Sequence, residues 1–172
     1  MMALNSQEGF PCRMAGKGTG SLDSINVSDG GVPKRSTLEA RVEIGGVAGD
    51  RQRNLKYHGG PERAVSLFAS ELIERIHAEG HPIAPGSTGE NLTVRGVEWS
   101  LVVPGRKVGV GTELVLEITS YVVPCRTIQA SFLDGRISRI SQKINPGWSR
   151  VYAKVVRAGI VRIGDDVVLL GS

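Results

Sequence analysis

Short runs that alternate apolar and polar residues, separated by glycine and proline turns, recur along most of this chain. A period of two is typical of half-buried β-strands, and glycine and proline mark the turns between them. The chain contains 23 glycines, which small barrels use at bulges and tight corners. The pattern therefore favours a mainly β fold, built as a curved barrel, over a parallel α/β fold. The expected strands are 21–28, 37–44, 92–95, 101–103, 112–123, 151–157, 159–163 and 166–170.

One segment shows the helical period. A short apolar run at 64–68 passes into 70–79, where Leu72, Ile73 and Ile76 form one apolar stripe. The shorter candidates are 127–132, expected to be helical, and 137–144, which fits either a helix or a loop. We therefore expect one clear helix and one or two short ones around the barrel.

The chain of 172 residues is long enough for one well-buried core and short for two. We expect a flexible leader at 1–20, followed by a single domain at 21–172. Two cysteines cannot form a disulfide framework, and no apolar run is long enough to span a bilayer. A cytoplasmic location is therefore expected, with no membrane association.

The charge balance weakly favours anionic partners, whereas the low aromatic content argues against nucleic acid and leaves a basic barrel that binds nucleic acid as a remote alternative. The formal net charge is +4, so anionic small molecules or phosphates are weakly favoured as ligands. Aromatic residues make up only 5% of the chain, which leaves few platforms on which bases can stack. Nucleic-acid binding is therefore not expected.

Cys125 follows a proline, directly after the alternating run at 112–123. Proline cannot continue a β-ladder, so the strand stops there and the thiol is presented to a loop. Arg126, and Lys56 with His58 if the fold brings them close, would favour the thiolate, which attacks electrophiles or binds soft metals. Free cysteine is also among the most buried residue types, so local sequence alone leaves a structural role open.

The stretch 49–63 concentrates basic residues and glycines in one connection. It includes Lys56, His58, Gly59, Gly60 and Arg63. Glycines let backbone amides approach a ligand closely, and lysine and arginine form charge-assisted hydrogen bonds to phosphate. The stretch therefore fits an anion-binding loop, and it fits a solvated basic loop equally well.

A second polar stretch, 86–92, leads into an expected strand. Its Glu90 and Asn91 offer acceptor and donor edges that suit a heterocycle, and the backbone around Gly89 adds amides. Asparagine and glycine are also good turn formers, so ordinary turn chemistry is the alternative interpretation.

Several of these motifs occur together in the order and spacing of one known family. They are Lys56-x-His58-Gly59-Gly60-x-x-Arg63-Ala64-Val65, Gly86-x-x-Gly89-Glu90-Asn91-Leu92, Pro104-Gly105, Pro124-Cys125-Arg126 and Gly164-Asp165-Asp166-Val167. From about Leu22 to Leu170, the chain resembles the MOSC domain, which is named for the C-terminal region of molybdenum-cofactor sulfurases.

The resemblance implies a β-barrel of the MOSC type that binds the molybdopterin form of the molybdenum cofactor. In family members, the cysteine at the position of Cys125 either ligates molybdenum or carries activated sulfur. Two functions are therefore implied: an oxidoreductase that reduces N-hydroxylated compounds, or a non-redox module that binds the cofactor or carries sulfur. Pyridoxal phosphate is associated with the family only through linked sulfurase regions, and we expect none in this chain.

The resemblance also implies roles for individual residues. We expect Cys125 to ligate molybdenum and His58 to shape the substrate side. The expected cofactor-binding residues are Lys56 and Arg63 for the phosphate, Glu90 and Asn91 for the pterin, and Gly59, Gly60, Gly89 and Arg126. The expected partners are a small-molecule substrate and an external reductase or sulfur donor, since no cysteine-rich segment suited to an iron–sulfur cluster is present.

Overall fold

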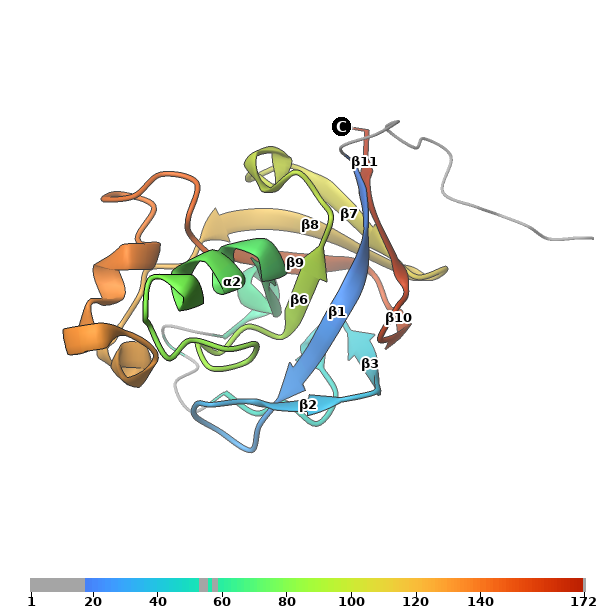
Figure 1. Ribbon diagram of the computed structural model, residues 1–172. Coiled ribbons are helices and arrows are strands. Elements are labelled where there is room, and N and C mark those ends of the chain that lie inside the picture. The colour runs from blue at the N-terminus through green and yellow to red at the C-terminus, as the bar shows by residue number, and fades with distance from the viewer. Residues whose placement is uncertain (1–17, 53–55, 57–58, 172) are drawn as a thin grey trace, which may run out of the picture.

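The computed structural model of the protein describes residues 18–52, 56 and 59–171, and seven of its strands form a closed barrel (Figure 1). Around the ring the order is β1, β11, β7, β8, β9, β5 and β6, and β1 pairs with both β6 and β11 to close it. The expected mainly β fold and curved barrel are confirmed. The bounds are β1 Thr19–Val27, β5 Val65–Ala69, β6 Leu92–Arg95, β7 Lys107–Val110, β8 Leu114–Tyr121, β9 Val151–Arg157 and β11 Asp166–Leu170.

A ring with an odd number of strands cannot be antiparallel at every step, and one pair in this barrel is parallel. β5 and β6 run parallel, with Leu67 opposite Leu92, whereas the other neighbouring pairs are antiparallel. A parallel pair needs a crossover connection. Helix α2 (Ser70–Ala78) lies in this connection, and its buried apolar residues confirm the stripe expected there.

The remaining strands lie beside the barrel. β2 (Arg35–Thr37) extends the barrel sheet from β1. β10 (Gly159–Arg162), β3 (Glu39–Glu43) and β4 (Gly46–Val47) form a separate three-stranded sheet. The single strand expected at 37–44 is therefore divided between two sheets, because the chain bends between β2 and β3.

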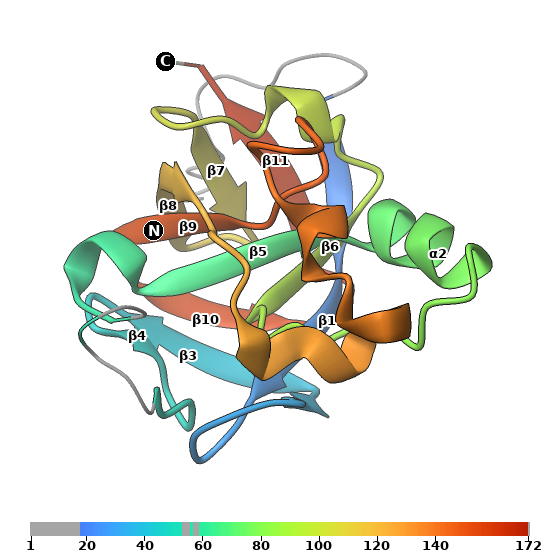
Figure 2. The ribbon, with the colours of Figure 1, turned by 90° about the vertical axis from the view of Figure 1, so that its left-hand side faces the viewer.

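Short 3-10 helices complete the secondary structure of the described residues. They are η1 Pro61–Arg63, η2 Trp99–Leu101, η3 Arg126–Ser131, η4 Leu133–Gly135 and η5 Ile137–Ile140. The short helix expected at 127–132 is found as η3, and the ambiguous segment 137–144 forms η5 followed by turns. The strand expected at 101–103 is wrong, because the segment leaves η2 as an irregular loop. Figure 2 shows η3, η4 and η5, in orange, on the outside of the barrel.

Two apolar clusters form the core. The larger fills the barrel, with inward side chains such as Val65 and Leu67 of β5 and Val151 of β9. The smaller lies outside the barrel, where Phe68 belongs to one cluster with the apolar side of α2 and with Ile128 of η3. Successive strand residues point to opposite faces. The outer face of β5 is therefore covered by helices and loops.

Strand β1 begins at Thr19, because Thr19 and Gly20 pair with Val168 and Val167 of β11. The last residues of the expected leader therefore belong to the barrel, and residues 1–17 lie outside the described part of the chain. Within the described residues, no helix has both the length and the apolar character needed to cross a membrane.

Candidate functional site

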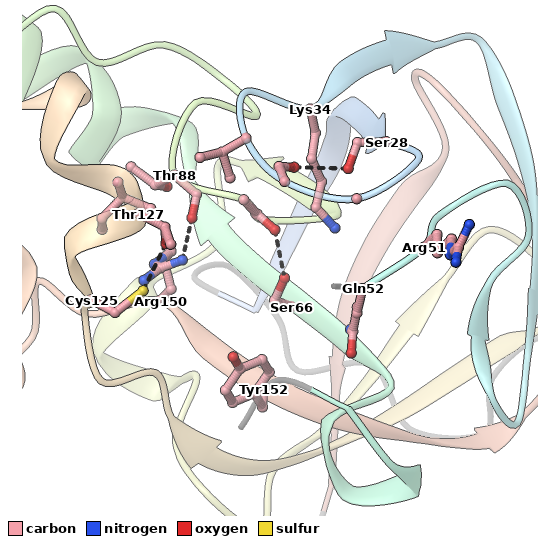
Figure 3. Close-up of a pocket in the computed structure, with 15 residues that line it drawn as sticks. Ser28, Lys34, Arg51, Gln52, Ser66, Thr88, Cys125, Thr127, Arg150 and Tyr152 are labelled. Atoms are coloured by element: carbon pink, nitrogen blue, oxygen red, sulfur yellow. Dashed lines mark hydrogen bonds between the residues drawn. The ribbon is translucent and has the colours of Figure 1, made fainter. Parts of the chain in front are cut away.

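A cavity of about 430 Å³ lies on the outer face of the barrel, against β5 and β9 (Figure 3). Ser66 of β5 and Tyr152 of β9 pair with each other across the two strands, and both line the cavity. Their neighbours Val65, Leu67 and Val151 belong to the barrel core, so Ser66 and Tyr152 point outward. The other lining residues come from 28–34, 51–52, 88–89, 125–128 and Arg150.

The register of the strands brings these distant segments together. Tyr121, Val151, Leu67, Leu92 and Ile25 form one row of paired residues across β8, β9, β5, β6 and β1. Lining residues lie within a few positions of this row: Cys125 after β8, Arg150 before β9, Ser66 in β5, Gly89 before β6 and Ser28 after β1. Strand pairing, rather than proximity in sequence, therefore builds the cavity.

Cys125 lies in the cavity wall just after β8 ends. Val122 still follows β9, because its N–H donates to the carbonyl of Arg150 at 2.9 Å. The chain then turns through Pro124, and Cys125 is half-buried, with its Sγ 2.7 Å from Oγ1 of Thr127. The thiol therefore borders a cavity instead of a sealed apolar interior, which leaves it accessible to a ligand.

Arg150 is a buried cation beside Cys125 (Figure 3). The residue is 6% exposed, its Nη1 donates to the carbonyl of Thr88, and its Nε is buried without a hydrogen-bond partner. Burial lowers the pKa of Arg150, and the charge of Glu90 opposes that shift. Sequence reasoning missed this residue, because an arginine at the start of a strand ordinarily faces water.

Tyr152 forms the adjoining wall. Burial raises the pKa of its phenol, and the charges of Arg150 and Arg63 oppose that change. The guanidinium carbon of Arg63 lies 5.7 Å from the centre of the Tyr152 ring. Arg63, expected to bind phosphate, is thus not among the described lining residues and instead packs against one of them.

The structure places Glu90 inside the 86–91 loop and not in the cavity wall. Glu90 is 0% exposed, and its carboxylate accepts hydrogen bonds from the Gly86 N–H at 2.5 Å and the Thr88 hydroxyl at 2.7 Å. These bonds hold the loop in shape. The Glu90 carboxylate is therefore engaged within the loop, and its expected contact with a pterin stays a prediction. Gly89, expected from the same stretch, lines the cavity.

Asn91 is also buried and occupied by internal hydrogen bonds. Its Oδ1 accepts from the Ser66 N–H at 3.1 Å, and its Nδ2 donates to the carboxylate of Asp50 at 2.8 Å. The side chain thus joins β5 to the 46–52 turn. Like Glu90, Asn91 is not among the described lining residues, and its expected contact with a pterin stays a prediction.

Four further residues expected from the sequence are absent from the described cavity lining: Lys56, Gly59, Gly60 and Arg126. Lys56 and Arg126 are exposed. His58 lies outside the described residues. Of the described residues in the basic stretch, Arg51 and Gln52 line the cavity.

Basic charge at the cavity comes from Lys34, Arg51 and Arg150, and no described lining residue is acidic. Lys34 is buried and ion-paired, with its Nζ 2.6 Å from Asp50 Oδ2. Arg51 is exposed and lies in the basic stretch singled out from the sequence, whereas no sequence signal marked Lys34. Elsewhere in the described chain, no three His, Cys, Asp or Glu side chains gather as they would around a metal ion. The cavity suits an anionic ligand.

Comparison with known proteins identifies the family and the fold. A family model described as "MOSC domain" matches residues 54–168. A curated protein of Bacillus subtilis, described as "Uncharacterized protein YflK", is 29% identical over 126 residues, which cover 71% of this chain and 54% of that protein. The chain thus spans about half the length of this relative.

Solved structures share the barrel at low sequence identity. The YUAD protein from Bacillus subtilis has a TM-score of 0.73 at 18% identity, covering 94% of this chain and 99% of that one. YiiM from Geobacillus stearothermophilus has a TM-score of 0.68 at 21% identity, with 88% and 75% covered. YiiM from Escherichia coli has a TM-score of 0.64 at 22% identity, with 90% and 70% covered. At these identities the likeness establishes the fold alone.

Proposed function

The chain belongs to the MOSC domain family, and on that premise we propose that its cavity binds the molybdopterin form of the molybdenum cofactor and that the protein reduces N-hydroxylated compounds. The observation that carries this proposal is the thiol of Cys125 in the wall of a cavity whose charged lining residues, among those that the structure describes, are all basic. The cavity volume of about 430 Å³ lies within the range of small-molecule sites.

The donor groups of the cavity fit this cofactor. Molybdopterin presents a phosphate, a hydrogen-bonding pterin and a dithiolene-bound metal, and a thiolate suits a metal already held by sulfur. Cys125 would supply that thiolate. Lys34 and Arg51 lie on the other side of Ser66 from Cys125 in Figure 3, where they would hold the phosphate in place of the expected Lys56 and Arg63.

When bound, the cofactor supplies the two-electron chemistry that removes oxygen from an N–OH group. In the net reaction the N–O bond breaks, an external reductase supplies two electrons, one proton converts the released hydroxide to water, and a second proton is taken up by the nitrogen. The chain would hold the metal through Cys125, and the half-buried position of this residue would partly shield the site from solvent. Tyr152, whose pKa is raised by burial, keeps its proton at neutral pH and can donate a hydrogen bond.

Molybdenum content and turnover together test the proposal. Protein made in cells that synthesise the cofactor should contain molybdenum and reduce an N-hydroxylated base when given an artificial reductant. Cys125→Ala should abolish turnover and lower the metal content, whereas Cys12→Ala, which removes the chain's other cysteine, should change neither. Wild-type protein without metal, or full turnover by Cys125→Ala, would contradict the proposal.

A sulfur-carrier function is the second candidate, favoured by the accessible position of the same thiol. After incubation with a persulfide donor, whose outer sulfur the thiolate attacks with release of the donor thiol, intact-mass analysis should then show one added sulfur atom that is absent in Cys125→Ala. A transferable persulfide without molybdenum-dependent turnover would select this function over the reductase.

A further inference from the structure

Arg150 is a buried cation whose hydrogen bonding is incomplete. Its guanidinium makes one hydrogen bond within the described chain, from Nη1 to the Thr88 carbonyl, and its buried Nε has no partner. No described carboxylate lies within the 4.0 Å ion-pair distance of its guanidinium. A buried charge without a paired anion is costly, and such a group in a native structure calls for an explanation.

The protein compensates this charge only at a distance. The Thr88 hydroxyl donates to the carboxylate of Glu90, while the Thr88 carbonyl accepts from Arg150. One residue therefore separates the buried carboxylate from the buried guanidinium. Glu90 opposes the effect of burial on Arg150 but does not complete its hydrogen bonding, so a position for an anion stays open next to Arg150.

Arg150 lies at the thiol end of the cavity. Figure 3 shows it beside Cys125 and Thr127, with Lys34 and Arg51 on the far side of Ser66. Under the proposed function, the phosphate of the cofactor is held at the Lys34 and Arg51 side and the reaction takes place near Cys125. The anion that pairs with Arg150 is then part of the substrate.

Resting on the function proposed above, we propose that Arg150 is a specificity-determining residue that holds a carboxylate of the N-hydroxylated substrate, with the Tyr152 hydroxyl as a second donor. A guanidinium matches a carboxylate with two parallel hydrogen bonds, so a charged oxygen pair is the group it recognises best. Tyr152 lines the same cavity, and Figure 3 shows its side chain on the Arg150 side of Ser66.

A matched pair of substrates tests this assignment. The probes are an N-hydroxylated benzamidine and the same compound with a para carboxylate, and kcat/KM is measured for each. The wild-type protein should prefer the carboxylate by about tenfold or more, as expected for a hydrogen-bonded charge pair. Arg150→Met should lose the preference. Arg150→Lys retains the charge but not the two parallel hydrogen bonds, so it should keep part of the preference.

Arg162→Met provides the control, because Arg162 is an exposed arginine of β10 paired with Glu39, away from the described cavity lining. It removes the same net charge and should leave the preference unchanged. Equal preference in wild type and Arg150→Met, with equal molybdenum content, would overturn the assignment. Loss of molybdenum from Arg150→Met without a carboxylate preference in the wild type would also overturn it, since Arg150 would then hold the cofactor.

A binding measurement on cofactor-free protein separates this inference from the proposed function. Benzoate should raise the melting temperature of the wild type and of Arg162→Met, but not of Arg150→Met, and neutral benzamide should raise none of them. Absence of a benzoate effect in the wild type overturns the carboxylate subsite even if molybdenum and turnover are found. A benzoate effect that depends on Arg150 supports the subsite even if the wild type contains no metal.

Discussion

Replacing Asp50 should test how the walls of the cavity are held together. Its carboxylate accepts hydrogen bonds from the Ser28 N–H at 2.9 Å, from Lys34 Nζ at 2.6 Å and from Asn91 Nδ2 at 2.8 Å. The side chains of the ion pair, Lys34 and Asp50, are only 8% and 4% exposed. One carboxylate thus joins the 28–34 loop, the 46–52 turn and the start of β6.

Asp50→Asn removes the charge and leaves the volume almost unchanged. Lys34 would then be a buried, unpaired ammonium, and breaking such a pair from one side costs about 3 kcal/mol or more. Lys34→Met should cost less, about 2 kcal/mol, because Asp50 keeps its other two donors. The double variant carries no unpaired charge, so its destabilisation should fall short of the sum of the single changes by about 2 kcal/mol.

Urea unfolding, followed by the fluorescence of the two tryptophans, measures these differences. A change of about 3 kcal/mol is a large part of the stability of an ordinary domain, so it is readily resolved. The four proteins form a double-mutant cycle. A coupling below about 0.5 kcal/mol would refute the reasoning, since the two side chains would then contribute independently.

Two further predictions concern the loops and the pH dependence. In urea unfolding, Gly86→Ala should destabilise the protein by about 2 kcal/mol more than Gly105→Ala. Both glycines have a positive φ, 81° at Gly86 and 90° at Gly105. Of the two, only Gly86 would place a Cβ 2.7 Å from a backbone oxygen, that of Lys34. The hydrogen bond from Ser70 holds the pKa of Asp23 below its ordinary 3.8, so this stabilisation is present above that pH and is lost as the pH falls through the folded value. The melting temperature should therefore fall less between about pH 5 and pH 3 in Asp23→Asn than in the wild type.

The period of the apolar residues was sufficient to predict most of the strands, because half-buried strands leave their alternation in the sequence, and the glycines between them favoured a curved barrel. The pairing of strands could not be read in the same way. The parallel contact of β5 and β6 depends on closing a ring, which no local pattern records. The strand expected at 101–103 failed for a related reason: Val102 is buried by packing of a loop, and local sequence does not distinguish that from burial in a sheet.

A site residue could be predicted where its neighbours in the sequence fix its position. Cys125 follows a proline that ends a strand, so its presentation to a loop could be anticipated. The positions of Glu90 and Asn91 were harder to predict, because the hydrogen bonds that suit a heterocycle also suit a loop backbone, and here both side chains bond to the backbone. Lys34 and Arg150 escaped notice, because burial of a charged side chain is decided by distant segments.

Lys34 and Arg150 differ in whether a carboxylate contacts them, and this difference determines how much an anionic ligand should stabilise the fold. Lys34 already has its counter-charge in Asp50, so a ligand at that side adds hydrogen bonds to a satisfied pair. Arg150 lacks a contacting carboxylate within the described chain, so an anion placed there removes a penalty as well as adding bonds. Any group that binds the folded state alone stabilises it, and the stabilisation grows with affinity. An anion bound beside Cys125 should therefore stabilise the folded protein more than an anion bound beside Lys34.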